Sequence, residues 1–198
     1  MNIPLPAQRM TVPEFLAWAE TQSEGRYELV DGVIRAMAPE RIVHGLVKKA
    51  IVRALDDAIQ GARLPCTALP DCAGVYISDK KFRIPDASVQ CGVELDPNSM
   101  ILDAPLIVVE VVSPSSERKD TLVKFIEYFS VSSIRHYLIV LPEERAILHH
   151  ERRGEDILTH VVRDGEITLT PPGITVPFAA LIGPVPLAGA DPGPGSSG

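Results

Sequence analysis

The chain has 198 residues, a length that suits one globular domain. Hydrophobic residues make up 45% of it and charged residues 23%, which excludes a chain that is disordered throughout and a collagen-like repeat. With 19 Lys and Arg against 26 Asp and Glu, the formal net charge is −7. This charge argues against non-specific coating of nucleic acid, which needs a cationic surface. It is compatible with an enzyme that contacts phosphate through a local site and a bound metal.

The cysteines and the N-terminus indicate the compartment. Cys66, Cys72 and Cys91 are odd in number and form no CxxC motif, so we expect no disulfide framework and no zinc ribbon, but three small buried side chains. The N-terminal residues lack the pattern of a signal peptide. The longest apolar stretch, 104–112, is interrupted by Glu110 and is too short to span a bilayer. We therefore expect a soluble, cytoplasmic protein with no membrane partner.

Capping residues, turn residues and hydrophobic periodicity predict the elements in chain order. The first half is predicted to contain a helix over 11–25, strands over 26–30 and 33–37 joined by an Asp31-Gly32 turn, a helix over 43–60 capped by Gly61, and strands over 64–69, 74–78 and 83–90. The second half is predicted to contain a central strand over 105–112, a helix over 116–129, a strand over 134–141, and a hairpin series over 146–150, 157–162 and 167–169. This order predicts an α/β domain with a mixed central β-sheet flanked by helices. We expect one domain over 1–183, followed by a disordered tail rich in Pro, Gly and Ser over 184–198.

Two acids within strand-like segments are the strongest candidate functional residues. Glu110 lies in the apolar run 107–112, and Asp86 lies in the segment 84–89. An ionised carboxylate in such a place loses its hydration unless a metal ion or a cationic neighbour compensates. Either acid alone is more simply explained by a buried arginine or by backbone amide groups. The two together, on adjacent strands, favour a hard divalent cation bound through oxygen.

Several short motifs resemble the Uma-two family, a branch of the PD-(D/E)xK nuclease superfamily. They are RYELVDG at 26–32, PDA at 85–87, VEVVSPS at 109–115, and Lys124 with Tyr128. They follow one another at natural spacings, and the resemblance runs from about residue 10 to residue 180. It implies a restriction-endonuclease-like core, a magnesium site in which Mn²⁺ can substitute, and phosphodiester hydrolysis.

Carried over residue by residue, the resemblance assigns roles to five positions. It implies that Asp86 and Glu110, with the backbone carbonyl of Val111, bind Mg²⁺. The usual lysine two residues after the second acid is missing, because Val112 occupies that position. The resemblance implies that Lys124, on the following helix, replaces it. Glu28 matches an upstream acid that would act through a second metal or a water.

The orientation of Lys124 stays open in the sequence. The predicted helix has an apolar stripe at positions i, i+3, i+4 and i+7, formed by Leu122, Phe125, Ile126 and Phe129. Lys124 lies about 150° from the centre of that stripe, on the same side as Asp120. One interpretation is therefore a solvent-facing Lys124 paired with Asp120. Catalysis by Lys124 requires a helix turned from this orientation, or a site that opens on that face.

The leading function is a Mg²⁺-dependent endonuclease with DNA as its substrate. The alternative is a non-catalytic interaction module that retains the nuclease fold, and both the acidic net charge and the missing lysine favour it. A glycosidase-type pair of carboxylates is a third interpretation, but nothing else indicates a sugar cleft. An exposed hairpin edge and the two-fold symmetry of DNA are compatible with a homodimer. His149 and His150 are expected on the surface of that edge hairpin.

Overall fold

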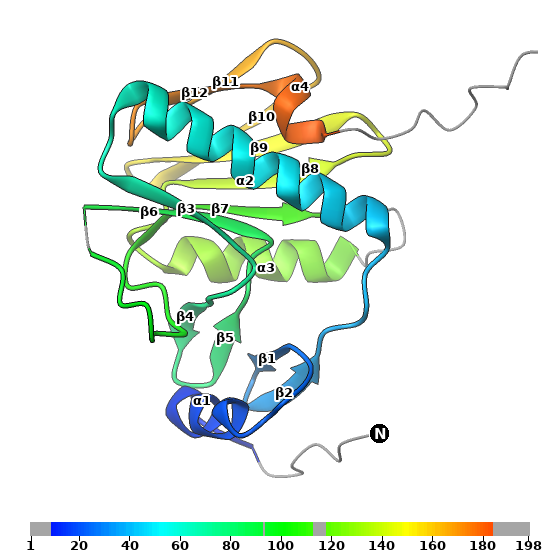
Figure 1. The fold of residues 1–198 in the computed structure, drawn as a ribbon, viewed down its shortest axis with the longest axis vertical. Coiled ribbons are helices and arrows are strands. Elements are labelled where there is room, and N and C mark those ends of the chain that lie inside the picture. Colours follow the sequence, from blue (N-terminus) through cyan, green and yellow to red (C-terminus); the bar gives the residue numbers. More distant parts are fainter. Residues whose placement is uncertain (1–8, 93, 113–117, 184–198) are drawn as a thin grey trace, which may run out of the picture.

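A six-stranded mixed sheet forms the centre of the molecule (Figure 1). The computed structural model describes residues 9–92, 94–112 and 118–183, so the predicted tail at 184–198 lies outside the described residues. The strand order is β10-β9-β8-β7-β6-β3, in which β7 and β8 are parallel and the other neighbours are antiparallel. These strands are β3 (Cys66–Pro70), β6 (Ala87–Cys91), β7 (Pro105–Val111), β8 (His136–Leu141), β9 (Ala146–Arg153) and β10 (Asp156–Val162). The predicted fold class is confirmed.

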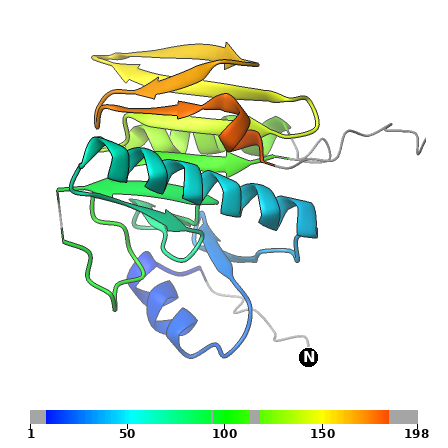
Figure 2. The same cartoon turned by 45° about the horizontal axis from the view of Figure 1, so that its top comes forward.

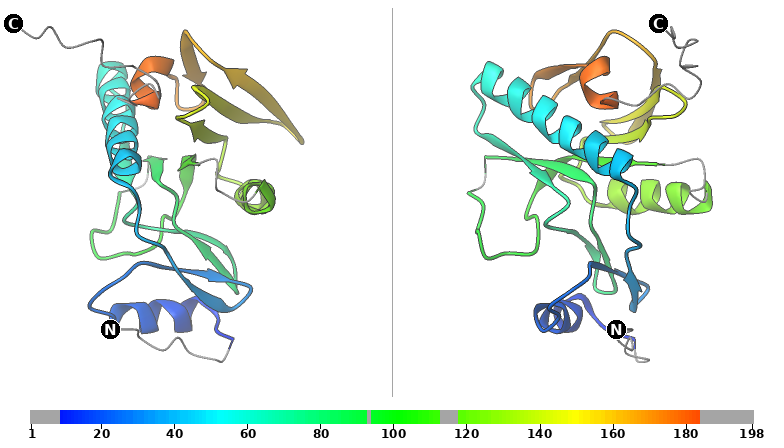
Figure 3. Two further views of the ribbon diagram at one scale, coloured as in Figure 1. Left: turned by 90° about the vertical axis from the view of Figure 1, so that its right-hand side faces the viewer. Right: turned by 45° about the vertical axis from the view of Figure 1, so that its right-hand side comes forward.

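Two helices, α2 (Ile42–Ala62) and α3 (Arg118–Ser130), cover the two faces of this sheet. Neighbouring residues of a strand point to opposite faces. Accordingly, Ile107 and Val109 of β7 pack in the core on the α2 side, whereas Val108 packs with Tyr128 of α3. The left view of Figure 3 shows the strands between the two helices. Within the described ranges, no helix is long and apolar enough to cross a membrane.

A smaller sheet with the order β2-β1-β5-β4 lies at the N-terminal end of the molecule, at the bottom of Figure 1. Its strands are β1 (Tyr27–Val30), β2 (Val33–Ala36), β4 (Val75–Ser78) and β5 (Lys81–Arg83), and it packs against α1 (Val12–Glu20). The predicted hairpin turn is present, with Asp31 and Gly32 at φ values of 52° and 79°. Such positive φ values at two successive residues are the conformation that Asp-Gly turns favour.

The C-terminal elements extend the core on the α2 side. The hairpin of β11 (Glu166–Leu169) and β12 (Ile174–Pro177) is followed by the short helix α4 (Phe178–Ile182). Figure 2 shows this hairpin and α4 beside α2. Leu169, Val176 and Leu181 are fully buried there, in the same core as α2. β12 and α4 are elements that the hydrophobic pattern did not predict.

Two predicted element boundaries are wrong for identifiable reasons. The predicted strand over 83–90 is divided, since β5 ends at Arg83 and β6 begins at Ala87. Pro85 lies between them, and proline has no N–H to donate to a strand ladder. Helix α2 runs through Gly61 and ends before Arg63, which takes the left-handed conformation at φ 53°. Arg63, not Gly61, is therefore the helix cap.

The expectation of three unbonded, buried cysteines is also wrong. Cys66 and Cys91 form a disulfide, although they lie 25 residues apart in the chain. They occupy directly opposite positions on the neighbouring strands β3 and β6, a register that cysteine spacing alone does not reveal. Cys72 is a free thiol, and it is exposed.

The histidines of β9 are buried, contrary to the expectation of a surface location. His149 and His150 are 4% and 8% exposed. The reason is that β9 lies between β8 and β10, so the edge strand on this side of the sheet is β10. The His149 ring also lies against His136 of β8, with 3.0 Å between Nε2 of His149 and Nδ1 of His136.

Candidate active site

Asp86 and Glu110 lie at the same end of the central sheet. In the antiparallel pair β6–β7, Ala87 lies opposite Val109. Asp86 precedes Ala87 and Glu110 follows Val109, so both acids lie at the end of this paired segment, where the backbone N–H of Asp86 donates to the carbonyl of Val109 at 2.9 Å. Each is only 6% exposed. The strand pairing thus brings the two predicted acids together in a buried place.

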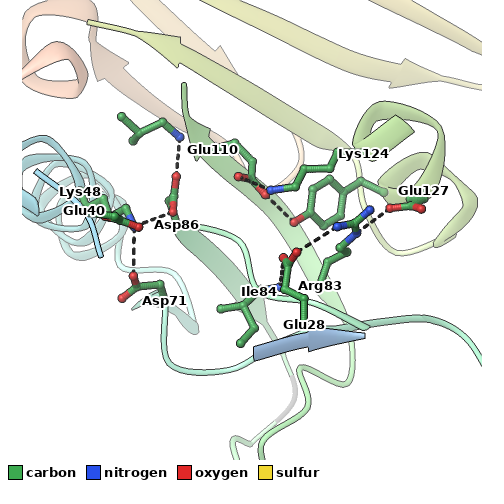
Figure 4. A network of polar contacts seen from close by, with 12 residues as sticks. Glu28, Glu40, Lys48, Asp71, Arg83, Ile84, Asp86, Glu110, Lys124 and Glu127 are labelled. Carbon is green, nitrogen blue, oxygen red and sulfur yellow. Dashed lines mark hydrogen bonds and ion pairs between the residues drawn. The ribbon is translucent and has the colours of Figure 1, made fainter. Parts of the chain in front are cut away.

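Glu110 is held by two donors from α3 (Figure 4). It lies on the α3 face of the sheet, two residues after Val108, which packs on that face. The ammonium of Lys124 donates to Oε2 of Glu110 at 2.9 Å, and the hydroxyl of Tyr128 donates to Oε1 at 2.7 Å. Residues four apart lie on one side of a helix, so Lys124 and Tyr128 reach the same carboxylate.

Helix α3 is therefore turned so that Lys124 faces the sheet, which is the orientation that catalysis by Lys124 requires. The prediction of an apolar stripe that includes Leu122 and Ile126 is wrong, because these side chains are 61% and 63% exposed. The side chain of Lys124 is only 15% exposed. The face of α3 that meets the sheet combines aromatic packing with the polar contact of Lys124 to Glu110, and a hydrophobicity pattern does not represent the polar contact. A solvent-facing Lys124 paired with Asp120 is not what the structure shows.

Asp86 is held from two directions. Its Oδ2 accepts a hydrogen bond of 2.6 Å from the backbone N–H of Val111, at the end of β7. Its Oδ1 forms an ion pair of 2.7 Å with the ammonium of Lys48, on α2. Figure 4 shows Lys48 and Lys124 on opposite sides of the two acids. Val111, predicted as a carbonyl ligand, is thus adjacent to Asp86 through its backbone.

Lys48 was not predicted, although the sequence contains a signal for it. Lys48, Ile51 and Leu55 lie at positions i, i+3 and i+7, which is the spacing of the buried stripe of α2. Lys48 is 7% exposed, and its ammonium also contacts Asp71 at 3.1 Å and Glu40. A lysine on the apolar stripe of a helix needs a buried partner, and here the partners are carboxylates.

Glu28 lies close to this site, but both of its carboxylate oxygens already accept hydrogen bonds. Arg83 donates to Oε2 at 2.9 Å, and the backbone N–H of Ile84 donates to Oε1 at 3.0 Å. Arg83, which is 3% exposed, also donates to Glu127 of α3 at 2.7 Å. Glu28 therefore connects β1 to α3 through Arg83, and its charge also acts on Glu110 and Lys124.

Burial governs the protonation of the two central acids. Burial is the main reason that the pKa of Glu110 is raised to about 7; Lys124 opposes this shift, and the charge of Asp86 adds to it. Burial also raises the pKa of Asp86, against the opposing effect of Lys48. Burial lowers the pKa of Lys124, but the carboxylates of Glu110 and Glu28 outweigh this, so its pKa is raised. Lys124 therefore stays protonated. The positive charges beside Asp86 and Glu110 only partly offset the cost of burying these carboxylates in their ionised form.

The donor set fits a hard divalent cation. Asp86 and Glu110 offer carboxylate oxygens and Val111 offers a main-chain carbonyl, and oxygen ligands of this kind suit Mg²⁺ and Mn²⁺. The raised pKa of Glu110 agrees with this fit, since a bound cation would stabilise the ionised form. An acidic cluster also extends beyond the pair, because carboxylate oxygens of Glu40, Asp71 and Asp86 lie within 4.8 Å of one another.

The mixed sheet flanked by helices, with two acids at one end, defines a restriction-endonuclease-like protein. The model of the Uma2 family, described as "Putative restriction endonuclease", matches residues 12–179. The chain therefore belongs to the Uma2 family, which confirms the resemblance of the short motifs.

Two further proteins are similar to this chain. An uncharacterized protein from Synechocystis sp. is 27% identical over 154 residues, which cover 77% of this chain and 80% of that protein. The crystal structure of a protein from Anabaena variabilis, described as a putative nuclease belonging to DUF820, matches with a TM-score of 0.68. The match covers 87% of this chain and 97% of that chain at 16% sequence identity, and it shows that the two share a fold.

Proposed function

We propose that this protein is a metal-dependent endonuclease that hydrolyses phosphodiester bonds in DNA, with Mg²⁺ as its ion. The observation that supports this most is the setting of Glu110. Its buried carboxylate contacts Lys124 and Tyr128, lies beside Asp86, and has a pKa raised to about 7. A perturbed acid with a charged partner and a second acid beside it is typical of a catalytic site.

The ion would be held by Asp86, Glu110 and the backbone carbonyl of Val111. A carboxylate has about four lone-pair positions, so the contacts to Lys48, Val111, Lys124 and Tyr128 leave positions free for a cation. When bound, a divalent ion lowers the pKa of a coordinated water and neutralises charge on the phosphate.

Lys124 carries the positive charge that the reaction needs beside the metal ligands. Its ammonium is kept protonated by Glu110 and Glu28. In the proposed mechanism it orients the attacking water or stabilises the negative charge that develops on the phosphate oxygens. The hydroxyl of Tyr128 and the N–H of Val111 fix the orientations of the Glu110 and Asp86 carboxylates.

Glu28 acts indirectly in this proposal. Its carboxylate binds Arg83, which in turn binds Glu127, three residues after Lys124 on α3. The bridge from β1 to α3 holds that helix in the orientation that directs Lys124 to Glu110. In this proposal Glu28 is therefore a positioning residue, whereas the resemblance implied that it acts through a second metal or a water.

We also propose that the protein acts as a homodimer, since two sites related by a two-fold axis would match the two strands of a DNA duplex. The edge strand β10 offers a surface for this contact, because its Val161 side chain is 61% exposed. Sedimentation analysis tests this proposal directly, and a purely monomeric protein at micromolar concentration would contradict it.

The experiment that tests the function is a plasmid-nicking assay in Mg²⁺ with the wild type, Glu110→Ala and Asp120→Ala. We expect nicking by the wild type that stops on addition of EDTA and is absent in Glu110→Ala. Asp120→Ala is the matched control, because Asp120 is an exposed acid on α3, and it should cleave like the wild type. Equal cleavage by Glu110→Ala would indicate a contaminating nuclease. Absence of cleavage by the folded wild type in Mg²⁺ and Mn²⁺ would favour the interaction module.

A further inference from the structure

Lys48 lies at the centre of a group of three carboxylates. Its ammonium is 2.7 Å from Asp86 and 3.1 Å from Asp71, and it also contacts Glu40. The side chain is 9% exposed, so a full positive charge is held inside the protein. Buried charges are retained only when they are paired, and here a single cation is paired with three acids.

The three carboxylates have the spacing of a metal-binding group. Oxygens of Glu40, Asp71 and Asp86 lie within 4.8 Å of one another. Arg26 contacts Glu40 and Asp71 from the more exposed side, with its own side chain 38% exposed. Lys48 is the cation that reaches all three acids, among the contacts of the described residues.

Asp86 belongs to two groups of acids. On one side it lies beside Glu110, with which it would hold the catalytic ion, and on the other it lies with Glu40 and Asp71. In two-metal sites the ions lie about 4 Å apart, which is close enough for one carboxylate between them to contact both. Asp86 has the place of such a bridging residue, but the second position is taken by the ammonium of Lys48.

We propose that Lys48 is a tethered cation that takes the place of a second metal ion and positions Asp86, so that the site binds one divalent ion. The proposal rests on the proposed function, since it assigns Asp86 to the ion held with Glu110. The ammonium fixes Oδ1 of Asp86 while the N–H of Val111 fixes Oδ2. It also repels a second cation from Glu40 and Asp71 by its own charge.

The test is the number of Mn²⁺ ions bound per chain, measured by calorimetric titration and by electron paramagnetic resonance of free Mn²⁺. We expect one ion in the wild type and two in Lys48→Ala, because removal of the ammonium frees space and charge among three acids. Lys48→Arg keeps the charge and should bind one ion. The matched control is Lys49→Ala, which removes an exposed lysine at the next position of α2 and should also bind one ion.

A double variant locates the additional ion. Adding Asp71→Asn to Lys48→Ala removes one carboxylate of the group and should return the count to one. If Lys48→Ala does not fold because three buried acids repel one another, Lys48→Gln supplies a neutral hydrogen-bonding side chain for the same titration. If neither variant folds alone, we expect Mn²⁺ to restore the folded circular dichroism spectrum, and failure to do so would overturn the proposal.

The outcomes separate this proposal from the proposed function. A count of one in the wild type and an unchanged count in the charge-removing variants would overturn the role of Lys48 and leave the nuclease site intact. A count of zero in the wild type and one in Lys48→Ala would support Lys48 as a substitute cation and contradict the ion at Asp86 and Glu110. No binding in either protein would overturn both.

Discussion

The ammonium of Lys124 lies 2.9 Å from the carboxylate of Glu110, across the contact between α3 and β7. The two side chains are 15% and 7% exposed, so the pair is largely shielded from water. Glu110 belongs to the strand that carries the proposed metal ligands, and Lys124 belongs to the helix that covers it. The contact therefore joins a proposed metal ligand to the positive charge that would assist the reaction.

Lys124→Ala should reduce plasmid cleavage in Mg²⁺ at least about tenfold, because a preorganised charge beside the phosphate is lost. Mn²⁺ binding should be nearly unchanged, since Asp86, Glu110 and Val111 remain. Nicking rates and Mn²⁺ titrations of the same preparations measure both quantities, with Lys49→Ala as the control for loss of an exposed lysine. Unchanged cleavage by Lys124→Ala would assign Lys124 a purely structural role.

Arg83→Met should lower the free energy of unfolding by about 3–5 kcal/mol, because it leaves two buried acids without their shared cation. Those acids are Glu28 and Glu127, which Arg83 contacts at 2.9 and 2.7 Å. Urea denaturation measures the loss. The control is Arg53→Ala, since Arg53 forms only an exposed pair with Asp57 and should unfold like the wild type. An equally small effect of both substitutions would contradict the role of the Arg83 bridge.

Acid should destabilise the protein through His149. His136 donates from Nε2 to the carbonyl of Pro171 at 2.9 Å, so its Nδ1 accepts the Nε2–H of His149. Burial, with the charges of His136 and His160, lowers the pKa of His149 to about 4. An unfolded histidine titrates near 6.5, so in the range between these values the unfolded state binds the additional proton. The stability is complete above about pH 6.5 and falls as the pH decreases toward 4.

The size of this effect can be isolated by substitution. Between pH 7.5 and pH 4.5, urea unfolding should show a loss of stability that is about 2–3 kcal/mol larger in the wild type than in His149→Gln, in which glutamine can still donate to His136. The control is His44→Gln, because His44 lies on α2 and is not among the groups that shift the pKa of His149, so this variant should lose stability like the wild type. An identical pH dependence in His149→Gln and the wild type would show that His149 is not the group responsible.

The strand that carries Glu110 could be predicted because its signal is local. The apolar run over 105–112 differs from β7 by one residue, and an uninterrupted run of this kind is typical of a strand covered on both faces. Asp86 could be predicted for a similar reason, together with the family motif. The carboxylates were recognisable as candidates because they interrupt apolar segments.

The partners of these acids could not be predicted because they depend on tertiary contacts. Arg83 meets Glu28 across 55 residues of sequence, and Lys124 meets Glu110 because α3 is turned so that Lys124 and Tyr128 face β7. A helical pattern that assumes an apolar interface places Leu122 inside, where the structure has it 61% exposed. Register between β3 and β6 likewise brings Cys66 opposite Cys91.

The most direct test of the central claim is the anomalous scattering of crystals grown with saturating Mn²⁺. The proposed mechanism predicts one manganese peak per chain, coordinated by carboxylate oxygens of both Asp86 and Glu110 and by the carbonyl of Val111. The two carboxylates would then lie roughly 3–6 Å apart, within reach of a shared ion. Crystals of Glu110→Ala prepared in the same way should lack the peak. Absence of manganese between Asp86 and Glu110 in the wild type, at concentrations that fill other sites, would contradict the assignment of this protein as a metal-dependent nuclease.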